Sequence, residues 1–336
     1  MRVVLVGLGS VGQGFLSILQ SEEAELRDRY GLRVKVIAAL DTSGAVVQPS
    51  GIPPDALLEA KRSGDGLAAL QPLYRPGRRA LEIIHTVDAD VVVEATPTNI
   101  LDAEPAMSHI RGALKTGRHV VTANKGPIAL AMPYLRALAE ERGVFLRFSG
   151  TVGGGTPMLD LARLGLRGDR ITSIAGILNG TTNYVLTRMA EGLDMEEALG
   201  EAQKFGYAEA DPTYDLKGID SGIKLAILAN WTMDAGLSVT DIDVRGIDGV
   251  TRTEVEKATA QGKVVKLLAR YDGSHATVSP EVLPENDPLS VRGRMNAVTY
   301  TTEHLGPVTL VGPGSGGRET AAAMLRDLID IHIRSR

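Results

Sequence analysis

Short apolar runs alternate with stretches of helical spacing in the first part of the chain. The runs occur in "VVLV", "LRVKVIAALD", "ADVVVEATPTN" and "GRHVVTANKGP". Apolar residues at i, i+3 and i+4 fill the stretches between them, which is typical of helices packed on a sheet. Repeated strand–helix–strand units predict a parallel sheet with right-handed crossovers. We therefore expect an α/β domain at the N-terminus.

The pattern changes in the second part of the chain. Strands are predicted in "RITSIAGIL", "VVKLLARYD", "HATVSPEVL" and "NAVTYTTEHLGPVTLVG", and a capped helix in "NGTTNYVLTRMAEG". Strands that follow one another locally and alternate in polarity predict an α+β domain whose sheet has one covered face. The tail, "GPGSGGRETAAAMLRDLIDIHI", reads as a glycine turn and a helix. We expect domains at 1–135 and 136–304, with 305–336 returning to complete the first.

A glycine fingerprint follows the first predicted strand. Gly7, Gly9 and Gly12 form G-x-G-x-x-G between "VVLV" and the helical "FLSILQ". The first glycine makes the turn, the second admits a pyrophosphate to the backbone, and the third lets helix and strand pack closely. The helix N-terminus adds N–H groups and a positive dipole end. An ordinary glycine-rich turn is the alternative. The cofactor-binding residues expected here are Gly7, Gly9, Ser10, Val11 and Gly12.

Other polar residues end the predicted strands. Asp41 lies 29 residues after Gly12, because the polar insert "SEEAELRDRYG" lengthens the usual spacing of about 20. An acid there commonly binds ribose hydroxyls, although it can also cap a turn. Thr96 and Lys125 follow later strands. Ligands of parallel sheets bind at the carboxyl ends of strands, so these residues predict a nicotinamide cofactor site.

Several carboxylates and one lysine crowd the stretch "GYAEADPTYDLKGIDSGIKLAIL". A helix from Asp220 to about Trp231 would place Lys224 in an apolar stripe, four residues after Asp220. An exposed pair of this kind would contribute only about 0.3–0.5 kcal/mol and mean little. A buried lysine held by carboxylates would instead be a functional candidate. The spacing alone leaves both interpretations open.

Composition narrows the classes of function. Lys and Arg total 36 and Asp and Glu total 41, a formal charge of −5 that disfavours nucleic acid as a partner. The absence of cysteine excludes disulfides and thiolate metal sites, and is compatible with the cytoplasm. No apolar run approaches the roughly 18–20 residues needed to span a bilayer. We expect a cytoplasmic enzyme with a small-molecule substrate and no membrane partner.

The acidic stretch resembles the signature of homoserine dehydrogenase. The resembling positions are Ala202, Gly206, Tyr207, Ala208, Asp211, Pro212, Asp215, Leu216, Gly218, Asp220 and Lys224. "GLGSVG", "EATPTN", "TANKGP", "TVGGGTP", "GILNGTTNYVL" and "GPGSGGRETA" also resemble family motifs in the family's order, from about residue 3 to 330. The resemblance implies a Rossmann dinucleotide-binding domain and an α+β substrate and dimerisation domain. It also implies interconversion of L-homoserine and L-aspartate 4-semialdehyde with NAD or NADP, on the way to threonine and methionine.

Roles carry over by motif position. By resemblance, Lys224 is the catalytic acid/base, assisted by Asp220 and by Lys125 near the nicotinamide. Glu209 and Asp220 match carboxylates that hold the substrate's amino group and reacting hydroxyl. Tyr207 and Asp215 match the same pocket, and Thr96 and Gly317 match cofactor contacts. Regulated members carry a C-terminal ligand-sensing extension that is not seen after this closing helix, so threonine control is not expected.

The turn from Thr151 to Pro157 resembles the family's sodium site, built largely from backbone carbonyls. The matching carbonyls belong to Val152, Gly154 and Thr156, so a monovalent cation is a possible cofactor. Ser149 stands where the family usually has glutamate, which predicts that a formal charge is missing and the cation is held weakly or not at all. We expect protein hydrogen bonds to fix the loop. A glycine-rich hinge without a cation is the alternative.

Two other functions compete. One is a different nicotinamide dehydrogenase on the same plan, acting on aspartate or a cyclic imine, which would lack the Asp220–Lys224 helix as a proton source. The other is a dinucleotide-binding sensor without catalysis. Such a sensor should have lost some of Lys125, Glu209, Asp220 or Lys224, and all four are present.

Overall fold

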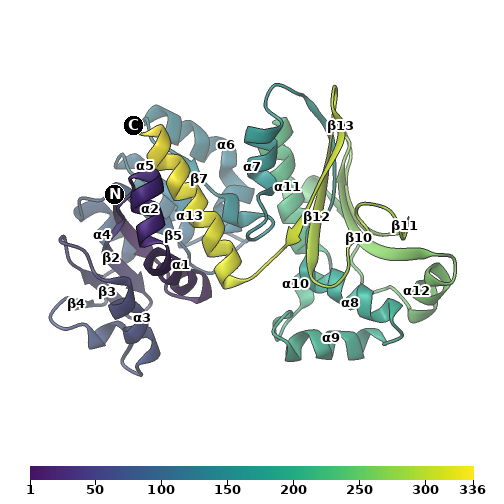
Figure 1. Cartoon of the computed structure of the whole chain (residues 1–336), viewed down its shortest axis with the longest axis horizontal. Helices are drawn as coiled ribbons and strands as arrows, with labels where there is room; N and C mark the ends of the chain where they lie inside the picture. Colours follow the sequence, from purple (N-terminus) through teal and green to yellow (C-terminus); the bar gives the residue numbers. More distant parts are fainter. The chain divides into compact units, whose positions relative to one another are not determined.

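The computed structural model describes residues 1–336 and divides into two compact units (Figure 1). Unit 1 comprises Met1–Thr151 and Gly316–Arg336, and unit 2 comprises Val152–Ser315. These junctions lie later in the chain than the boundaries expected at residues 135 and 304. The first lies later because a long helix (Lys125–Glu141) still belongs to the first unit and a further strand (Leu146–Arg147) pairs in its sheet. The second lies later because the last strand pairs within the second sheet.

Unit 1 is built on a seven-stranded sheet in the order β4-β3-β2-β1-β5-β6-β7. Strands β2, β1, β5, β6 and β7 are parallel, and β3 and β4 add an antiparallel edge. The strands are β1 (Arg2–Val6), β2 (Lys35–Asp41), β3 (Gly44–Val47), β4 (Tyr74–Pro76), β5 (Val91–Glu94), β6 (His119–Thr122) and β7 (Leu146–Arg147). The parallel core confirms the predicted α/β domain, whereas β3 and β4 were not anticipated.

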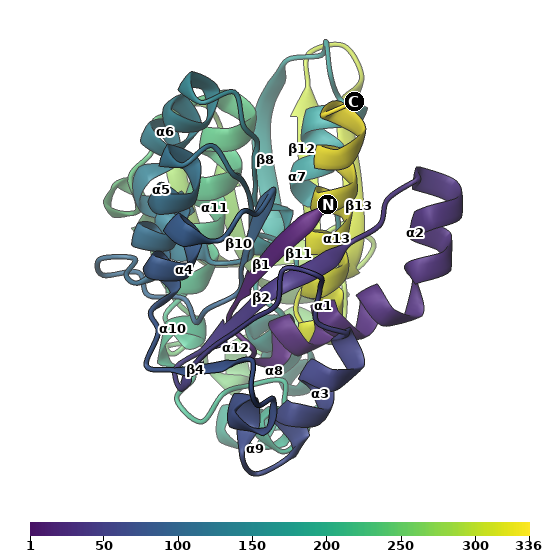
Figure 2. The same ribbon diagram turned by 90° about the vertical axis from the view of Figure 1, so that its left-hand side faces the viewer.

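Helices cover both faces of this sheet. They are α1 (Ser10–Ser21), α2 (Glu23–Tyr30), α3 (Pro54–Arg62), α4 (Ala80–Thr86), α5 (Ala106–Lys115), α6 (Lys125–Glu141) and α13 (Gly317–Arg334). The 3₁₀ turns are η1 (Gly66–Ala69) and η2 (Ser149–Thr151). Figure 2 shows α4, α5 and α6 on one side of β1 and β2, with α1 and α13 on the other. The polar insert after α1 is helical and forms α2.

The core of unit 1 joins its two ends in the sequence. Phe15 and Leu16 of α1 lie in one buried cluster with Val3 and Leu5 of β1 and with Met324 of α13. Buried apolar side chains of this size contribute about 1.5–3 kcal/mol each. The C-terminal helix therefore returns to the first unit, as its glycine turn and helical spacing predict.

Unit 2 contains a six-stranded sheet in the order β13-β12-β8-β10-β11-β9. Its strands are β8 (Ile171–Ile177), β9 (Asp243–Val244), β10 (Lys263–Tyr271), β11 (Ala276–Pro284), β12 (Met295–Thr302) and β13 (Gly306–Pro313). Its helices are α7 (Met158–Asp160), α8 (Gly180–Ala190), α9 (Met195–Lys204), α10 (Thr213–Leu216), α11 (Ile219–Met233) and α12 (Arg252–Thr259), with a π-helical segment, η3 (Leu161–Gly165), and a 3₁₀ turn, η4 (Val239–Asp241). The four strands predicted from alternation are all present, and the fourth segment forms the β12–β13 hairpin.

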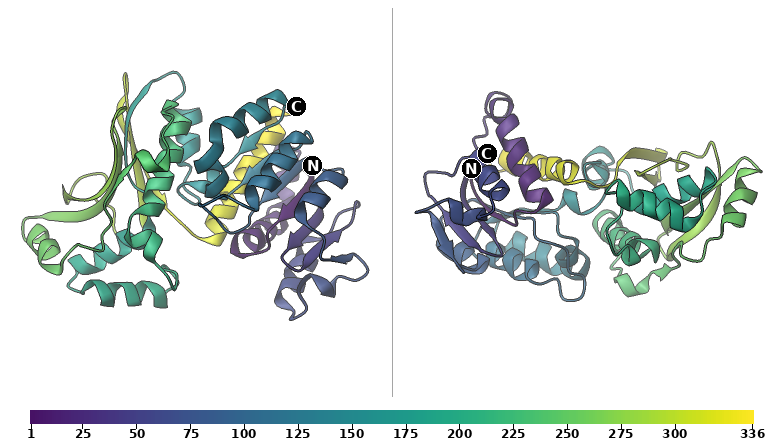
Figure 3. Two further views of the ribbon diagram at one scale, coloured as in Figure 1. Left: turned by 180° about the vertical axis from the view of Figure 1, so that it is seen from behind. Right: turned by 90° about the horizontal axis from the view of Figure 1, so that it is seen from below.

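Helix α11 lies along one face of this sheet (Figures 1 and 3). The opposite face is less covered, because Ser173 and Ala175 are only partly buried although β8 is an inner strand. Their neighbours on that face, Thr299 and Arg270, are also partly exposed. One well-covered face and one partly open face confirm the predicted α+β arrangement. None of the helices combines the length and apolar character needed to cross a membrane.

Candidate active site

The glycine fingerprint lies at the carboxyl end of β1. Gly7 has a φ of +100°, and a Cβ there would lie 2.5 Å from the carbonyl oxygen of Ala95. A Cβ on Gly12 would lie 2.0 Å from the Gly7 carbonyl oxygen, so both positions require glycine. A Cβ on Gly9 would meet no atom within 4 Å, which leaves the start of α1 open. This combination fits a pyrophosphate approaching the N-terminus of α1, where the first turn contains no acidic residue.

Gly317 and α1 approach closely within unit 1. A Cβ on Gly317 would lie 2.8 Å from the Ser10 carbonyl oxygen, and a Cβ on Gly14 would lie 2.8 Å from the Gly317 carbonyl oxygen. The first residue of α13 therefore lies beside the first turn of α1. Gly317 lies next to the fingerprint although 305 positions separate it from Gly12.

Asp41 ends β2 with its carboxylate fully engaged. Its Oδ2 lies 2.8 Å from Lys61 Nζ, and its Oδ1 accepts from the Ser43 amide at 2.9 Å and from the Ser43 hydroxyl at 2.6 Å. Burial works against ionisation, but the hydrogen bonds from Lys61 and Ser43 outweigh it and lower the pKa of Asp41. The residue therefore caps a turn at the end of β2 and pairs with Lys61, and its role toward the ribose stays a prediction.

The carboxyl ends of β5 and β6 share a hydrogen-bond network. Asn124 caps α6, and its Nδ2 donates to the carbonyl oxygens of Thr96 at 3.1 Å and Pro97 at 3.0 Å. Lys125 is the first residue of α6. The structure thus places Thr96 and Lys125, both predicted from the sequence, at one edge of the sheet of unit 1.

A buried lysine–carboxylate cluster lies at the start of α11 in unit 2. Lys224 and Asp220 are each only 8% exposed, and Lys224 Nζ lies 2.7 Å from Asp220 Oδ2. Lys224 Nζ also donates to the Leu178 carbonyl oxygen at 2.7 Å. Burial excludes the interpretation as a surface ion pair. The helix begins at Ile219, close to the predicted start, because Gly218 has a φ of +78° and ends the preceding turn.

Asn179 joins this pair to a second carboxylate. It is the N-cap of α8, and its Nδ2 donates to Asp220 Oδ2 at 2.9 Å and to Asp215 Oδ1 at 2.6 Å. Burial, followed by the nearby Asp220 charge, raises the pKa of Asp215. One amide therefore bridges two carboxylates beside one ammonium. Sequence reasoning missed Asn179, although its place before a helix in the "NGTTNY" motif was a usable signal.

Tyr207 and Glu209 lie on the loop between α9 and α10. The Tyr207 carbonyl oxygen accepts from Thr181 Oγ1 at 2.8 Å, and its ring packs edge-on against Tyr184 with centroids 5.1 Å apart. The loop is therefore tied to the first turn of α8. Glu209 is exposed and makes no hydrogen bond with Asp215, Asp220 or Lys224. Of the predicted substrate-binding residues, the structure brings Asp215 and Asp220 together but leaves Glu209 outside the cluster.

The predicted cation turn is fixed by its own hydrogen bonds. Gly153 and Gly154 have φ values of +78° and +55°, and the Thr156 amide donates to the Gly153 carbonyl oxygen at 2.8 Å. The Thr156 carbonyl oxygen, a predicted cation ligand, accepts from the Met158 amide at 2.8 Å. The Val152 and Gly154 carbonyls belong to the same tight path. Internal hydrogen bonding agrees with the expectation for the loop, and cation binding stays a prediction.

The prediction that a negative charge is missing near Ser149 is wrong. Asp327 of α13 is 1% exposed and accepts from the Ser149 amide at 2.8 Å and from its hydroxyl at 2.6 Å. A carboxylate is thus present, but it comes from the returning helix, 178 positions later in the chain. Sequence spacing gave no signal for this contact, because it depends on how α13 packs.

A second buried lysine lies in unit 2. Lys266 of β10 is 2% exposed, and its Nζ donates to Asn183 Oδ1 at 2.7 Å and to the Val291 carbonyl oxygen at 2.6 Å. Burial, followed by the charge of Arg292, lowers the pKa of Lys266 to about 8. Its partners are neutral oxygens of α8 and of the loop before β12. It therefore holds those elements together without an opposing carboxylate.

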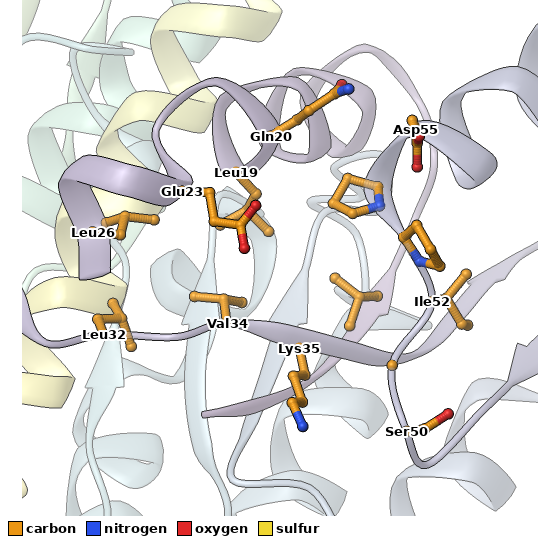
Figure 4. Close-up of a pocket in the computed structure, with 14 residues that line it drawn as sticks. Leu19, Gln20, Glu23, Leu26, Leu32, Val34, Lys35, Ser50, Ile52 and Asp55 are labelled. Carbon is orange, nitrogen blue, oxygen red and sulfur yellow. The ribbon is translucent and has the colours of Figure 1, made fainter. Parts of the chain in front are cut away.

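Unit 1 contains a pocket of about 420 Å³ (Figure 4). Its lining residues are Leu19, Gln20, Glu23, Leu26, Leu32, Val34, Lys35, Val36, Ser50, Gly51, Ile52, Pro53, Pro54 and Asp55. Lys35 begins β2, whereas Asp41 ends it, so the length of the strand, about 20 Å, separates the pocket from the cofactor edge. None of the predicted site residues lines this pocket.

The chain is similar to known proteins along nearly its whole length. Residues 7–149 match the model of the family "Homoserine dehydrogenase, NAD binding domain", and residues 157–329 match "Homoserine dehydrogenase". A homoserine dehydrogenase of Methanocaldococcus jannaschii is 40% identical over 99% of this chain and 98% of its own. An NAD(+)-dependent homoserine dehydrogenase of Pseudomonas canavaninivorans is 41% identical over 98% of this chain and 96% of its own.

Solved structures agree with these sequence relatives. The crystal structure of a putative homoserine dehydrogenase from Archaeoglobus fulgidus superposes with a TM-score of 0.90 at 37% identity, covering 99% of both chains. A hyperthermophilic archaeal homoserine dehydrogenase in complex with NADPH gives a TM-score of 0.86 at 30% identity, covering 99% of this chain and 98% of the other. The sequence similarity covers both units, including the glycine turn of unit 1 and the buried lysine–carboxylate cluster of unit 2. The chain therefore belongs to the homoserine dehydrogenase family.

Proposed function

We propose that this protein catalyses the reversible, NAD(P)-dependent interconversion of L-homoserine and L-aspartate 4-semialdehyde, with Lys224 as the proton-transferring group. The family membership supports the reaction, and the observation that carries the role of Lys224 is its buried contact with Asp220. Such a reaction serves the synthesis of amino acids, towards threonine and methionine. A sensor without catalysis would have no need to keep a lysine and a carboxylate buried, since burying charges is costly.

Lys224 is oriented to present a proton to a substrate oxygen. An ammonium group has three N–H donors, and here Asp220 and the Leu178 carbonyl oxygen accept two of them. The third N–H remains for the carbonyl oxygen of the semialdehyde, which gains a proton from it when the aldehyde carbon is reduced. In the opposite direction, the homoserine hydroxyl gives its proton to neutral Lys224. The nicotinamide cofactor supplies the chemistry of hydride transfer.

The carboxylates near Lys224 have distinct proposed roles. Asp220 balances the ammonium charge and, together with Asp215, is held by the Asn179 amide. Asp215 and Tyr207 line the proposed substrate site, where a carboxylate suits the amino group of the substrate. Glu209 is proposed to contact that amino group as well, and its exposure on the loop between α9 and α10 leaves its carboxylate accessible to the substrate.

Residues of unit 1 are proposed to bind the cofactor and to provide a second lysine. The glycine turn accommodates the pyrophosphate, Asp41 the ribose, and Thr96, Lys125 and Gly317 the nicotinamide side. The chain uses NAD or NADP, as the NAD-binding domain indicates. The contact between Asp41 and Lys61 supports use of both, because Lys61 offsets the repulsion between a carboxylate and the 2′-phosphate of NADP.

The protein is further proposed to be a cytoplasmic homodimer. The partly open sheet face of unit 2, with Ser173, Ala175 and Thr299, supports the dimer because it offers a second copy of the chain a surface on which to pack. A monovalent cation at the Val152–Thr156 turn is proposed to bind weakly if at all, because the Thr156 carbonyl oxygen already accepts from the Met158 amide. Size measurements in solution would test the dimer.

The reaction is tested by following nicotinamide absorbance with three kinds of substrate. L-Homoserine should reduce the cofactor, whereas L-aspartate and simple alcohols should not. L-Aspartate 4-semialdehyde should oxidise the reduced cofactor in the reverse assay. Turnover with L-aspartate and none with L-homoserine would contradict the proposal.

A further inference from the structure

Glu94 is a fully buried carboxylate that the proposed mechanism does not use. It ends β5, is 0% exposed, and immediately precedes Ala95, whose amide donates to the Val6 carbonyl oxygen at 2.8 Å. Its backbone therefore lies beside the glycine turn. A buried carboxylate requires several hydrogen-bond donors, because an unsatisfied charge is expensive in the protein interior.

Each donor to Glu94 comes from a residue at the cofactor edge. Oε1 accepts from the Thr96 amide at 3.2 Å and from the Thr96 hydroxyl, and Oε2 accepts from Thr122 Oγ1 at 3.3 Å. An ionised carboxylate only accepts hydrogen bonds, so it fixes the direction of both hydroxyl protons. The lone pairs of the two hydroxyls then point away from Glu94.

Asn124 uses those lone pairs. Its backbone amide donates to Thr122 Oγ1 at 3.0 Å, and its Nδ2 lies 3.3 Å from Thr96 Oγ1. Its Oδ1 in turn accepts from the Gly126 amide at 3.1 Å, in the first turn of α6. The network therefore runs from Glu94 through two threonines to the helix start that carries Lys125. Replacing the carboxylate by an amide would put a donor against a hydroxyl whose proton already points at it.

No lysine or arginine neutralises Glu94. The nearest group of possible opposite charge is His109 of α5, whose Nδ1 lies 3.6 Å from Oε1 and makes no hydrogen bond. The side chain of His109 is 9% exposed, so water contributes little screening around the pair. This imidazole is thus the only group of possible positive charge within 4 Å of the Glu94 carboxylate.

We propose that Glu94 is a positioning residue whose charge also makes the protein bind the oxidised cofactor in preference to the reduced one. This rests on the proposed function, in which Thr96 contacts the nicotinamide. The oxidised nicotinamide ring carries a positive charge and the reduced ring does not. A nearby buried carboxylate therefore attracts only the oxidised form, since a fixed group shifts an equilibrium by its differential interaction with the two states.

The test measures binding rather than turnover. The fluorescence of bound NADH gives its Kd, and competition gives the Kd of NAD⁺; the phosphorylated pair replaces them if it binds more tightly. In Glu94→Gln, the ratio of the oxidised to the reduced Kd should rise at least about five-fold over wild type. Thr122→Val is the matched control, because it removes one donor but keeps the charge. Its two Kd values should rise together.

A second variant covers the case in which Glu94→Gln does not fold. His109→Lys places a permanent cation opposite Glu94 and should raise the same ratio, while the donors to Glu94 stay in place. If Glu94→Gln folds and its ratio of oxidised to reduced Kd equals that of wild type, the inference is overturned, whatever happens to activity. If only His109→Lys folds, an unchanged ratio in that variant overturns it in the same way. Wild-type protein that binds neither form of the cofactor would contradict the proposed function itself.

Discussion

Replacing Lys224 tests both the proposed chemistry and the energetics of the buried cluster. Lys224→Met keeps much of the apolar stem and removes the ammonium. Asp220 would then remain 8% exposed with the Asn179 amide but without the cation 2.7 Å away. Breaking a buried pair by removing one partner typically costs about 3–5 kcal/mol. We therefore expect a clear loss of unfolding free energy.

The double variant Asp220→Asn/Lys224→Met separates stability from catalysis. It removes both charges, and an asparagine can still accept from the Asn179 amide, so most of the lost stability should return. Activity should not return, because the proton-transferring group is still missing. The expected fall in kcat is at least about 100-fold in both variants.

Two assays decide the outcome. Chemical unfolding gives the free energies of wild type and both variants, and homoserine oxidation gives kcat and KM at saturating cofactor. A folded Lys224→Met protein with near-normal kcat would refute the role in proton transfer. Equal stability of wild type and Lys224→Met would refute the argument that Asp220 depends on its partner.

Four further predictions follow from individual groups. The pKa of Asp215 is raised in the folded state, so the contribution of this side chain to the unfolding free energy is present at low pH and is lost as pH rises through the folded pKa. The measured unfolding free energy should therefore fall over that pH range in wild type but not in Asp215→Asn. The pKa of Lys266 is lowered from 10.5 to about 8 in the folded state, so the unfolding free energy of wild type should rise by up to about 3 kcal/mol relative to Lys266→Met between pH 8 and pH 10.5. Unfolding measurements across this pH range check it. NAD should be used at least as well as NADP, as judged by kcat/KM. Lys61→Ala should raise the ratio of kcat/KM for NAD to that for NADP, because Asp41 then repels the 2′-phosphate unopposed. A fall in this ratio would mean that Asp41 points away from the cofactor. Replacing sodium by a bulky organic cation at constant ionic strength should change activity little, and a saturable sodium requirement would contradict the weak site expected at Val152–Thr156.

Periodicity and strand-end residues predicted much of the fold. The glycine turn, the parallel strands and the helix holding Lys224 are local patterns, and each is found where the sequence placed it. That helix is buried on all sides from Asp220 to Asn230, however, and not along one apolar stripe. Local spacing also located Asp220 relative to Lys224, because i and i+4 positions of a helix are neighbours.

Contacts between distant elements were not predictable in the same way. Asn179 meets Asp215 and Asp220 only after α8 and α11 pack in unit 2, and Asp327 meets Ser149 only after α13 packs in unit 1. The sequence shows polar residues at these positions but not their partners. The error about the charge near Ser149 arose because a missing carboxylate in one segment was supplied by another.

The return of α13 to unit 1 has a consequence for synthesis of the chain. Residues 152–315 must be made before the buried side chains of α13, such as Met324 and Leu328, exist to cover the α1 side of the first sheet. At roughly 5–20 residues per second, this delay lasts about 8–33 s. During that interval the nascent first unit exposes apolar surface beside Phe15 and Leu16, which makes it a substrate for chaperones on the ribosome. Completion of the first unit is therefore coupled in time to completion of the whole chain.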